Sequence, residues 1–78
     1  MINKLATRTV TGIHTLTGKT LTYTVEAIED TAKEVDRGRW MVLVNGRPTR
    51  WYGMEKPALR CVRKAIVGGY GISFGEAF

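Results

Sequence analysis

The chain has 78 residues, with 12 Lys and Arg against seven Asp and Glu, for a formal net charge of +5. This length suits one domain, which we expect to span residues 1–78, and it leaves little interior for an enclosed substrate pocket. The single Cys61 excludes an internal disulfide bond and indicates a reducing, intracellular setting. No apolar run approaches the ~20 residues that cross a bilayer, and residues 1–6 contain no signal-peptide stretch. We therefore expect a soluble protein without a membrane partner.

The charges are distributed unevenly along the chain. Residues 26–36 carry five acids against one cation, Lys33, whereas residues 37–75 carry eight cations against one acid, Glu55. A chain polarised in this way suits a charged partner.

Residues 7–28 are rich in threonine and β-branched side chains, with a Thr-Gly turn signal near their middle. From residue 20 to residue 27 apolar and polar residues alternate, which is the period of a half-buried strand. In the preceding strand, Val10 and Ile13 fall out of phase with Gly12 between them, which predicts a β-bulge there. We interpret this segment as a β-hairpin.

Residues 29–38 are polar and connect this hairpin to the next one. Residues 31–34, Thr-Ala-Lys-Glu, fit a capping box that opens a short helical turn, and a mobile loop fits them equally well. The sequence leaves both interpretations open.

Asn45-Gly46 gives the clearest local signal in the chain. The pair is favoured in two-residue type I′ turns because both residues tolerate positive φ, and apolar runs flank it. Such a turn predicts the cross-strand pairs Trp40–Trp51, Val42–Thr49 and Val44–Arg47 on one face, and Met41–Arg50 and Leu43–Pro48 on the other. The missing N–H of the proline suits an edge strand.

Residues 54–67 have the pattern of an amphipathic helix. Pro57 falls in its first turn, where proline is tolerated, and Gly68-Gly69 is expected to end it. Its apolar stripe consists of Ala58, Leu59, Val62, Ala65 and Ile66. Alternation of Tyr70, Ile72 and Phe74 with small residues predicts a last short strand. The order ββββαβ predicts an α+β fold, mainly an antiparallel β-sheet with one helix packed on one face.

Catalytic and metal-binding groups are scarce in this sequence. His14 and Cys61 have no ligand partners at the spacing of a zinc site. Basic neighbours could lower the pKa of the Cys61 thiol, although a helix cysteine more commonly packs in the core. The carboxylates of residues 26–36 lack the apolar surroundings that raise a carboxyl pKa, and the glycines after the helix do not lead into a phosphate-binding helix N-terminus. We therefore predict neither enzymatic activity nor a bound metal or cofactor.

Cations and large aromatic side chains interleave on the second predicted hairpin, and further cations share one side of the predicted helix. The predicted partner-binding residues are Arg37, Arg39, Arg47, Arg50, Trp51, Tyr52, Lys56, Arg60, Arg63 and Lys64. For the two tryptophans, a cross-strand core pair is an equally good interpretation. A plain solvated helix face, the alternative for the helix cations, would more often include acids.

Two classes of partner fit such a surface. DNA or RNA would meet the cations with its phosphates and stack unpaired bases on Trp or Tyr. An acidic or nucleic-acid-handling protein would use the Trp, Tyr and Arg side chains that are enriched at interface hot spots. No helix-turn-helix, zinc-finger, KH or RNP-type motif is present to decide between the two.

The chain combines a compact ββ(ββ)α plan, an Asn45-Gly46 hairpin leading into Lys56–Ile66, and no catalytic set. In these features it resembles the small proteins that phages and mobile elements direct against their hosts, including anti-CRISPR proteins. The resemblance implies a non-enzymatic inhibitor in the host cytoplasm, a monomer or small homo-oligomer that blocks a nucleic-acid-handling complex from engaging DNA or RNA. Its basic charge argues against DNA mimicry. The alternative is a small basic protein that binds DNA or RNA directly.

Overall fold

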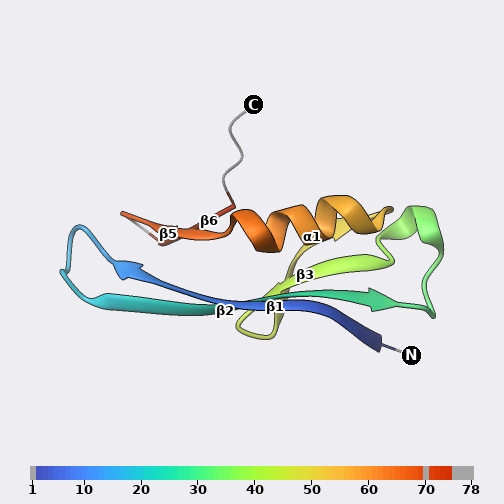
Figure 1. The fold of residues 1–78 in the computed structure, drawn as a ribbon, viewed down its shortest axis with the longest axis horizontal. Coiled ribbons are helices and arrows are strands. Elements are labelled where there is room, and N and C mark those ends of the chain that lie inside the picture. Colours follow the sequence, from blue (N-terminus) through green and yellow to red (C-terminus); the bar gives the residue numbers. More distant parts are fainter. Residues whose placement is uncertain (1, 70, 75–78) are drawn as a thin grey trace.

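The computed structural model describes residues 2–69 and 71–74. The elements are β1 (Ile2–Ile13), β2 (Thr20–Asp30), the 3-10 turn η1 (Val35–Arg37), β3 (Trp40–Val44), β4 (Arg47–Tyr52), α1 (Glu55–Lys64), β5 (Ile66–Gly68) and β6 (Gly71–Ser73). The first four strands form an antiparallel sheet in the order β1-β2-β3-β4, and β5 and β6 form a separate ribbon. Helix α1 and this ribbon lie in a second layer on one face of the sheet (Figure 1). The predicted α+β class is confirmed.

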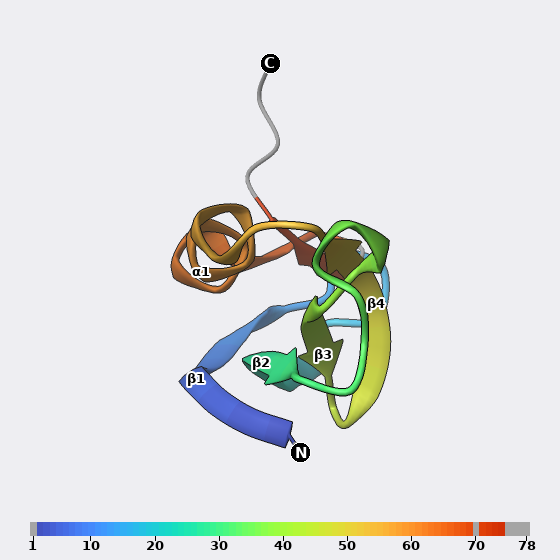
Figure 2. The ribbon, with the colours of Figure 1, turned by 90° about the vertical axis from the view of Figure 1, so that its right-hand side faces the viewer.

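The core lies between the sheet and α1. Alternate residues of β2, Val25 and Ala27, have no exposed surface, and neither has Val42 of β3. Ala58 and Val62, one helical turn apart, meet them from α1 with 3% exposure or less. Figure 2 shows α1 over the β1 side of the sheet, with β4 on the other side. Removal of this apolar surface from water is the main stabilising contribution.

The first hairpin forms, but it spans residues 2–30 instead of the predicted 7–28. Its bulge lies at Leu5, and the predicted bulge at Gly12 is wrong. A Cβ on Gly12 would lie 2.7 Å from the Cβ of Val67. Because glycine has no side chain, it allows β5 to approach β1 closely at this position. At the actual bulge, Leu5 and Ala6 both pack against the core. An extra residue in one strand allows this because it interrupts the alternation of faces.

Asn45 and Gly46 form the predicted turn, with φ of 51° and 81°. The pairs Leu43–Pro48 and Val44–Arg47 match the predicted register. Beyond them the prediction is wrong: the structure pairs Trp40 with Tyr52, Met41 with Trp51 and Val42 with Arg50.

A bulge at Thr49 causes this difference. Pro48 has no N–H to donate, and the Thr49 hydroxyl instead donates to the Val42 carbonyl at 3.0 Å. The extra residue places Arg50 and Tyr52 on the face of the sheet that α1 covers. It places Trp51 on the opposite face.

Helix α1 ends at Lys64, before the predicted end at residue 67, because Ala65 turns to extended backbone with φ of −63° and ψ of 130°. The β-branched Ile66 and Val67 then pair with β6. Strand β5 was not predicted, and Ile66 is 52% exposed instead of completing the apolar stripe. Of the predicted last strand, β6 is present and Tyr70 lies outside the described residues. Within residues 2–69 and 71–74, no helix has the length and apolar character needed to cross a membrane.

The segment between the two hairpins contains one short helical turn. Strand β2 runs to Asp30, whose carboxylate accepts a hydrogen bond from the Ala32 N–H at 3.1 Å. The helical turn is η1, which begins at Val35, so residues 31–34 do not form the capping-box turn that was one of the two open interpretations. The Asp30 side chain instead holds the chain in a local turn there.

We expect Gly46→Ala to lower the free energy of unfolding by about 1 kcal/mol, because an L side chain is strained at positive φ. Space around the new Cβ is open, so no clash contributes. Gly68→Ala is the matched control, since its φ lies outside the positive range and the nearest atom to its Cβ is a carbonyl oxygen at 3.6 Å. Urea unfolding measures both, and equal midpoints would contradict the assigned turn.

Candidate functional site

The structure does not bring the ten predicted partner-binding residues onto one surface. An exposed group on α1 contains Lys56, Arg60, Arg63 and Lys64. A second group, partly buried and in internal contacts, contains Arg39, Arg50 and Tyr52. The remaining residues, Arg37, Arg47 and Trp51, are exposed at separate places.

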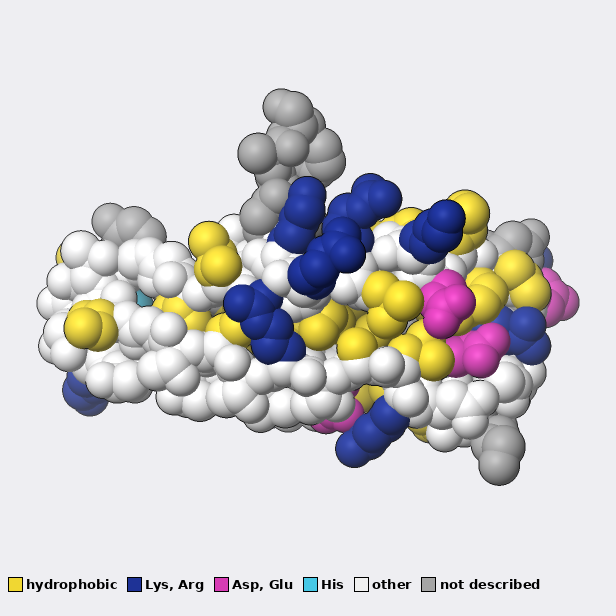
Figure 3. Space-filling model, viewed as in Figure 1, with side chains coloured by type: hydrophobic (Ala, Val, Ile, Leu, Met, Phe, Trp, Pro, Cys, Tyr) yellow, Lys and Arg dark blue, Asp and Glu magenta, His cyan; other side chains and the backbone are white. Residues whose placement is uncertain are grey.

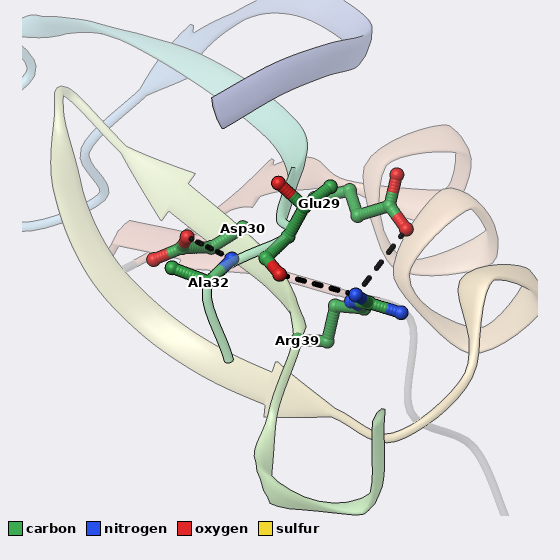
Figure 4. Close-up of polar contacts among 5 residues, drawn as sticks. Glu29, Asp30, Ala32 and Arg39 are labelled. Carbon is green, nitrogen blue, oxygen red and sulfur yellow. Dashed lines mark hydrogen bonds and ion pairs between the residues drawn. The ribbon is translucent and has the colours of Figure 1, made fainter. Parts of the chain in front are cut away.

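Arg39 links the start of β3 to the segment between the two hairpins and to the end of β2. Its Nη2 donates to the Thr31 carbonyl at 3.1 Å, and its Nε lies 3.8 Å from the Glu29 carboxylate. Figure 4 shows Arg39 directed at Glu29, with the Asp30–Ala32 turn beside it. About a quarter of each ion-pair side chain is exposed, so the pair is partly shielded from water. These contacts give Arg39 a role in the fold.

Arg50 and Tyr52 face the helix layer. The Arg50 guanidinium lies over the Phe74 ring, 4.8 Å from its centre. Tyr52 packs against the core, and burial together with a hydrogen bond to Cys61 raises the pKa of its hydroxyl. Burial also raises the pKa of the Cys61 thiol, with its Tyr52 hydrogen bond and the Arg50 charge acting in the opposite direction. Arg50 thus lowers the pKa of Cys61 as a basic neighbour should, but desolvation outweighs it and the net shift is upward. Of the two interpretations of Cys61, packing in the core is the one that the structure supports.

Trp51 lies on the face of the sheet that α1 does not cover. It is 54% exposed and sits opposite the buried Met41. A Cβ on Gly38 would lie 2.8 Å from the Cβ of Trp51, so the tryptophan packs against the connecting segment. Trp40, in contrast, packs partly buried against the main core. The two tryptophans therefore do not form a cross-strand pair.

The other two exposed arginines also stand apart from α1. Arg37 in η1 forms an exposed ion pair with Glu34 at 3.2 Å. Arg47 follows the β3–β4 turn, which lies below the sheet when α1 lies above it (Figures 1 and 2). The interleaving of cations and aromatics seen in the sequence is thus divided between both faces of the sheet.

The four helix cations form a continuous row. Their positions fall within about 100° around α1 and about 12 Å along it. The buried residues of α1, Ala58, Cys61 and Val62, face the other way. Among the described residues, none forms an ion pair with a member of this row. Figure 3 shows Lys and Arg side chains gathered over the helix, and we call Lys56, Arg60, Arg63 and Lys64 the α1 row.

Arg8, which was not predicted as a site residue, extends the positive charge from α1 to the sheet. From β1, its Nη1 donates to the carbonyls of Val62, at 3.4 Å, and Arg63. These carbonyls belong to the helix end, which the macrodipole makes negative. The sequence contained a signal for this position. Residues two apart in a strand lie on the same face, so Arg8 shares the helix side of the sheet with the buried Val10.

Helix stability explains only part of the α1 row. Arg63 and Lys64 lie in the last turn, where cations favour the helix. Lys56 lies in the first turn, where a cation is unfavourable, and Arg60 lies in the middle. The helix macrodipole therefore does not account for the cation at Lys56.

The described residues include no group of three His, Cys, Asp or Glu side chains that could hold a metal ion. No protein-family model, curated protein or solved structure matches this chain.

We expect Lys56→Glu to raise the free energy of unfolding by about 0.5–1 kcal/mol. The new carboxylate would lie in the first turn of α1 and four residues before Arg60, and both placements favour a helix. Lys19→Glu, in the exposed β1–β2 turn, makes the same charge change and should alter stability by about 0.5 kcal/mol or less. Urea unfolding at low salt compares the two. A destabilised Lys56→Glu variant would mean that Lys56 already supports the helix.

Proposed function

We propose that this chain is a non-enzymatic inhibitor that docks on an acidic surface of a nucleic-acid-handling protein and prevents that protein from engaging DNA or RNA. The observation that supports it is the α1 row, and Lys56 above all, whose charge opposes the helix dipole. Exposed cations without acidic partners offer a charged surface that steers an acidic partner into place.

The placement of the aromatic side chains favours a protein over nucleic acid as the direct ligand. Single-stranded nucleic acid is held by aromatic platforms next to cations, and bases stack on them. Here Tyr52 packs in the core and Trp51 lies on the opposite face from α1. Trp40, the third aromatic of the hairpin, also packs against the core, so the α1 row offers charge without an exposed hairpin aromatic beside it.

Acidic surfaces with a functional role occur on many nucleic-acid-handling proteins. Carboxylates hold Mg²⁺ at sites of phosphoryl transfer, and such a site must stay open to the nucleic acid. A basic helix placed over these carboxylates would compete with both the metal and the substrate. Occupation alone would inhibit, so the inhibitor needs no catalytic residues of its own.

Direct binding to nucleic acid is the competing outcome, and it can be measured with the purified protein. We expect only weak binding to duplex and single-stranded DNA and RNA, without preference among them, by fluorescence anisotropy across a salt series. If the α1 row contacted duplex phosphates, log affinity would fall against log salt with a slope of about 0.9 per phosphate. Tight binding with such a slope, flattened by Lys56→Glu and Arg60→Glu, would replace the proposed function with direct nucleic-acid binding.

A further inference from the structure

Strand β1 forms an open edge of the main sheet. The strand order is β1-β2-β3-β4, so β1 pairs with β2 alone on one side. It is 12 residues long, and long unpaired edges are templates on which another strand can add. Proteins commonly shorten, cover or charge such edges.

The hydrogen bonds of Thr24 show which backbone groups of β1 point outward. The Thr24 carbonyl accepts from the Asn45 N–H at 2.8 Å, and the Thr24 N–H donates to the Asn45 side chain at 2.9 Å. Both groups of Thr24 thus point toward β3, so its pair with Thr9 is one of the non-hydrogen-bonded pairs of the β1–β2 ladder. The N–H and C=O of Thr9 therefore point away from β2, out of the sheet edge. The same alternation applies to Thr7 and Thr11.

A groove runs along this edge. It has a volume of about 280 Å³ and lies between residues 8–11 of β1 and residues 65–67 after α1. Thr9 and Thr11, whose backbone groups point outward, belong to one of its walls. Within the described chain β2 is the strand that pairs with β1 in its sheet. Strand β5 approaches β1 closely at Gly12, so the part of the edge beside Thr7 and Thr9 is the more open to an incoming backbone.

The charges around the groove select its occupant. Strand β1 contains Lys4 and Arg8 and no acid, but Lys4 forms an ion pair with Glu26 of β2 at 3.3 Å, so Arg8 is the cation of β1 that carries the argument. Arg8 bonds to the end of α1, where Arg63 and Lys64 are exposed. Figure 3 shows basic side chains above and beside an apolar seam at this edge of the molecule, with acidic side chains at the right-hand end of the seam and below it. A strand that carries acidic side chains on its helix-facing side would meet these cations.

The same charges disfavour a second copy of this chain as the occupant. Antiparallel pairing of two β1 strands centred on Thr9 would place both Arg8 side chains diagonally opposite each other on one face. It would also bring the basic ends of both α1 helices to the same interface. Like charges at this distance are destabilising, whereas an acidic strand is attracted.

We infer that the β1 edge binds an extended acidic segment of the partner protein, which adds to the sheet as a further strand beside Thr7, Thr9 and Thr11. This inference rests on the proposed function, because it names how the partner engages the surface next to the α1 row. Backbone hydrogen bonds supply affinity, and Arg8, Arg63 and Lys64 supply selectivity for acidic side chains.

Amide hydrogen exchange of the ¹⁵N-labelled full chain tests the inference with a short synthetic peptide in which threonine and glutamate alternate. We expect exchange at Thr7, Thr9 and Thr11 to slow by about tenfold or more, because these amides become hydrogen-bonded to the peptide. Amides that already bond to β2, such as that of Val10, should change little. A peptide with lysine in place of glutamate should have no effect. Unchanged exchange at the three threonines, or equal slowing by both peptides, would overturn the inference.

Thr9→Pro provides the matched variant. It removes one outward N–H at an edge position where proline is tolerated, so the fold should persist while peptide-induced protection of Thr7 and Thr11 disappears. Thr9→Val keeps the N–H and should retain protection.

Failure of this inference is distinguishable from failure of the proposed function. Binding of the partner protein to each immobilised variant separates the two. If the Thr9→Pro variant still binds the partner and a variant with reversed charges in the α1 row does not, the edge inference alone fails. If the peptide protects the edge but reversal of the α1 row leaves capture intact, the proposed role of the row fails instead.

Discussion

Val42→Asp is expected to abolish cooperative folding of this domain at 25 °C. Val42 has no exposed surface and lies between β2 and β4 under α1. A carboxylate there would lie opposite Arg50, which is only partly buried and whose guanidinium already lies over Phe74. An unpaired buried charge costs several kcal/mol, against a total stability of roughly 4–12 kcal/mol for a domain of this size. Circular dichroism and urea unfolding should show an unfolded chain.

Two controls separate a charge effect in the core from a general effect of substitution in the sheet. Val42→Ala should fold and lose about 2 kcal/mol, the cost of the removed methyl groups and the cavity. Thr20→Asp, on an exposed position of β2, should lose about 1 kcal/mol or less. A Val42→Asp variant with a wild-type unfolding curve would contradict the assigned core.

The features that the sequence predicted correctly depend on neighbours along the chain. The period of two in residues 20–27 defines β2, and the spacing of Ala58 and Val62 defines the buried side of α1. Asn45-Gly46 forms its turn because of what these two residues allow at positive φ. Each of these signals is complete within one element, which is why no tertiary information was needed.

The features that were missed depend on contacts between distant segments. In the sequence, Gly12 was interpreted as part of a β-bulge. Its structural role, the close packing of Val67 against β1, depends on a residue 55 positions later in the chain. The bulge at Thr49 follows from a hydroxyl that reaches the Val42 carbonyl across the hairpin. Strand β5 forms because β6 pairs with it and not because of a strong pattern of its own.

The candidate site was affected most by the bulge at Thr49. One extra residue reverses the faces of Arg50, Trp51 and Tyr52, and with them the surface that the sequence pattern indicated. The α1 row was predictable because helix periodicity alone places its members together. The sequence could have predicted the face of the sheet on which the Arg8 side chain lies. It could not have predicted the hydrogen bonds of Arg8 to the end of α1, because those carbonyls lie more than 50 positions later in the chain.

Reversal of charge in the α1 row is expected to abolish binding to the partner. Lys56→Glu combined with Arg60→Glu would place two carboxylates against an acidic surface, where like charges cost several kcal/mol. A loss of about 3 kcal/mol corresponds to roughly a hundredfold weaker affinity. The fold should be retained, because both side chains are exposed and Lys56→Glu favours the helix.

The matched control combines Lys19→Glu with Arg47→Glu. It changes the net charge by the same amount at exposed positions that lie outside α1. Arg47 belongs to the hairpin, so this variant also separates the hairpin from the α1 row as the contact surface. A general loss of electrostatic attraction would weaken both double variants equally.

Capture of the partner on immobilised protein, from a nuclease-treated lysate of the cell in which the protein acts, tests the proposed role of the α1 row most directly. Wild type and the Lys19→Glu, Arg47→Glu control should retain the same nucleic-acid-handling protein, identified by mass spectrometry. The Lys56→Glu, Arg60→Glu variant should retain roughly a hundredfold less of it at limiting concentration. Capture that disappears on nuclease treatment, or that survives reversal of the α1 row, would contradict the proposed function.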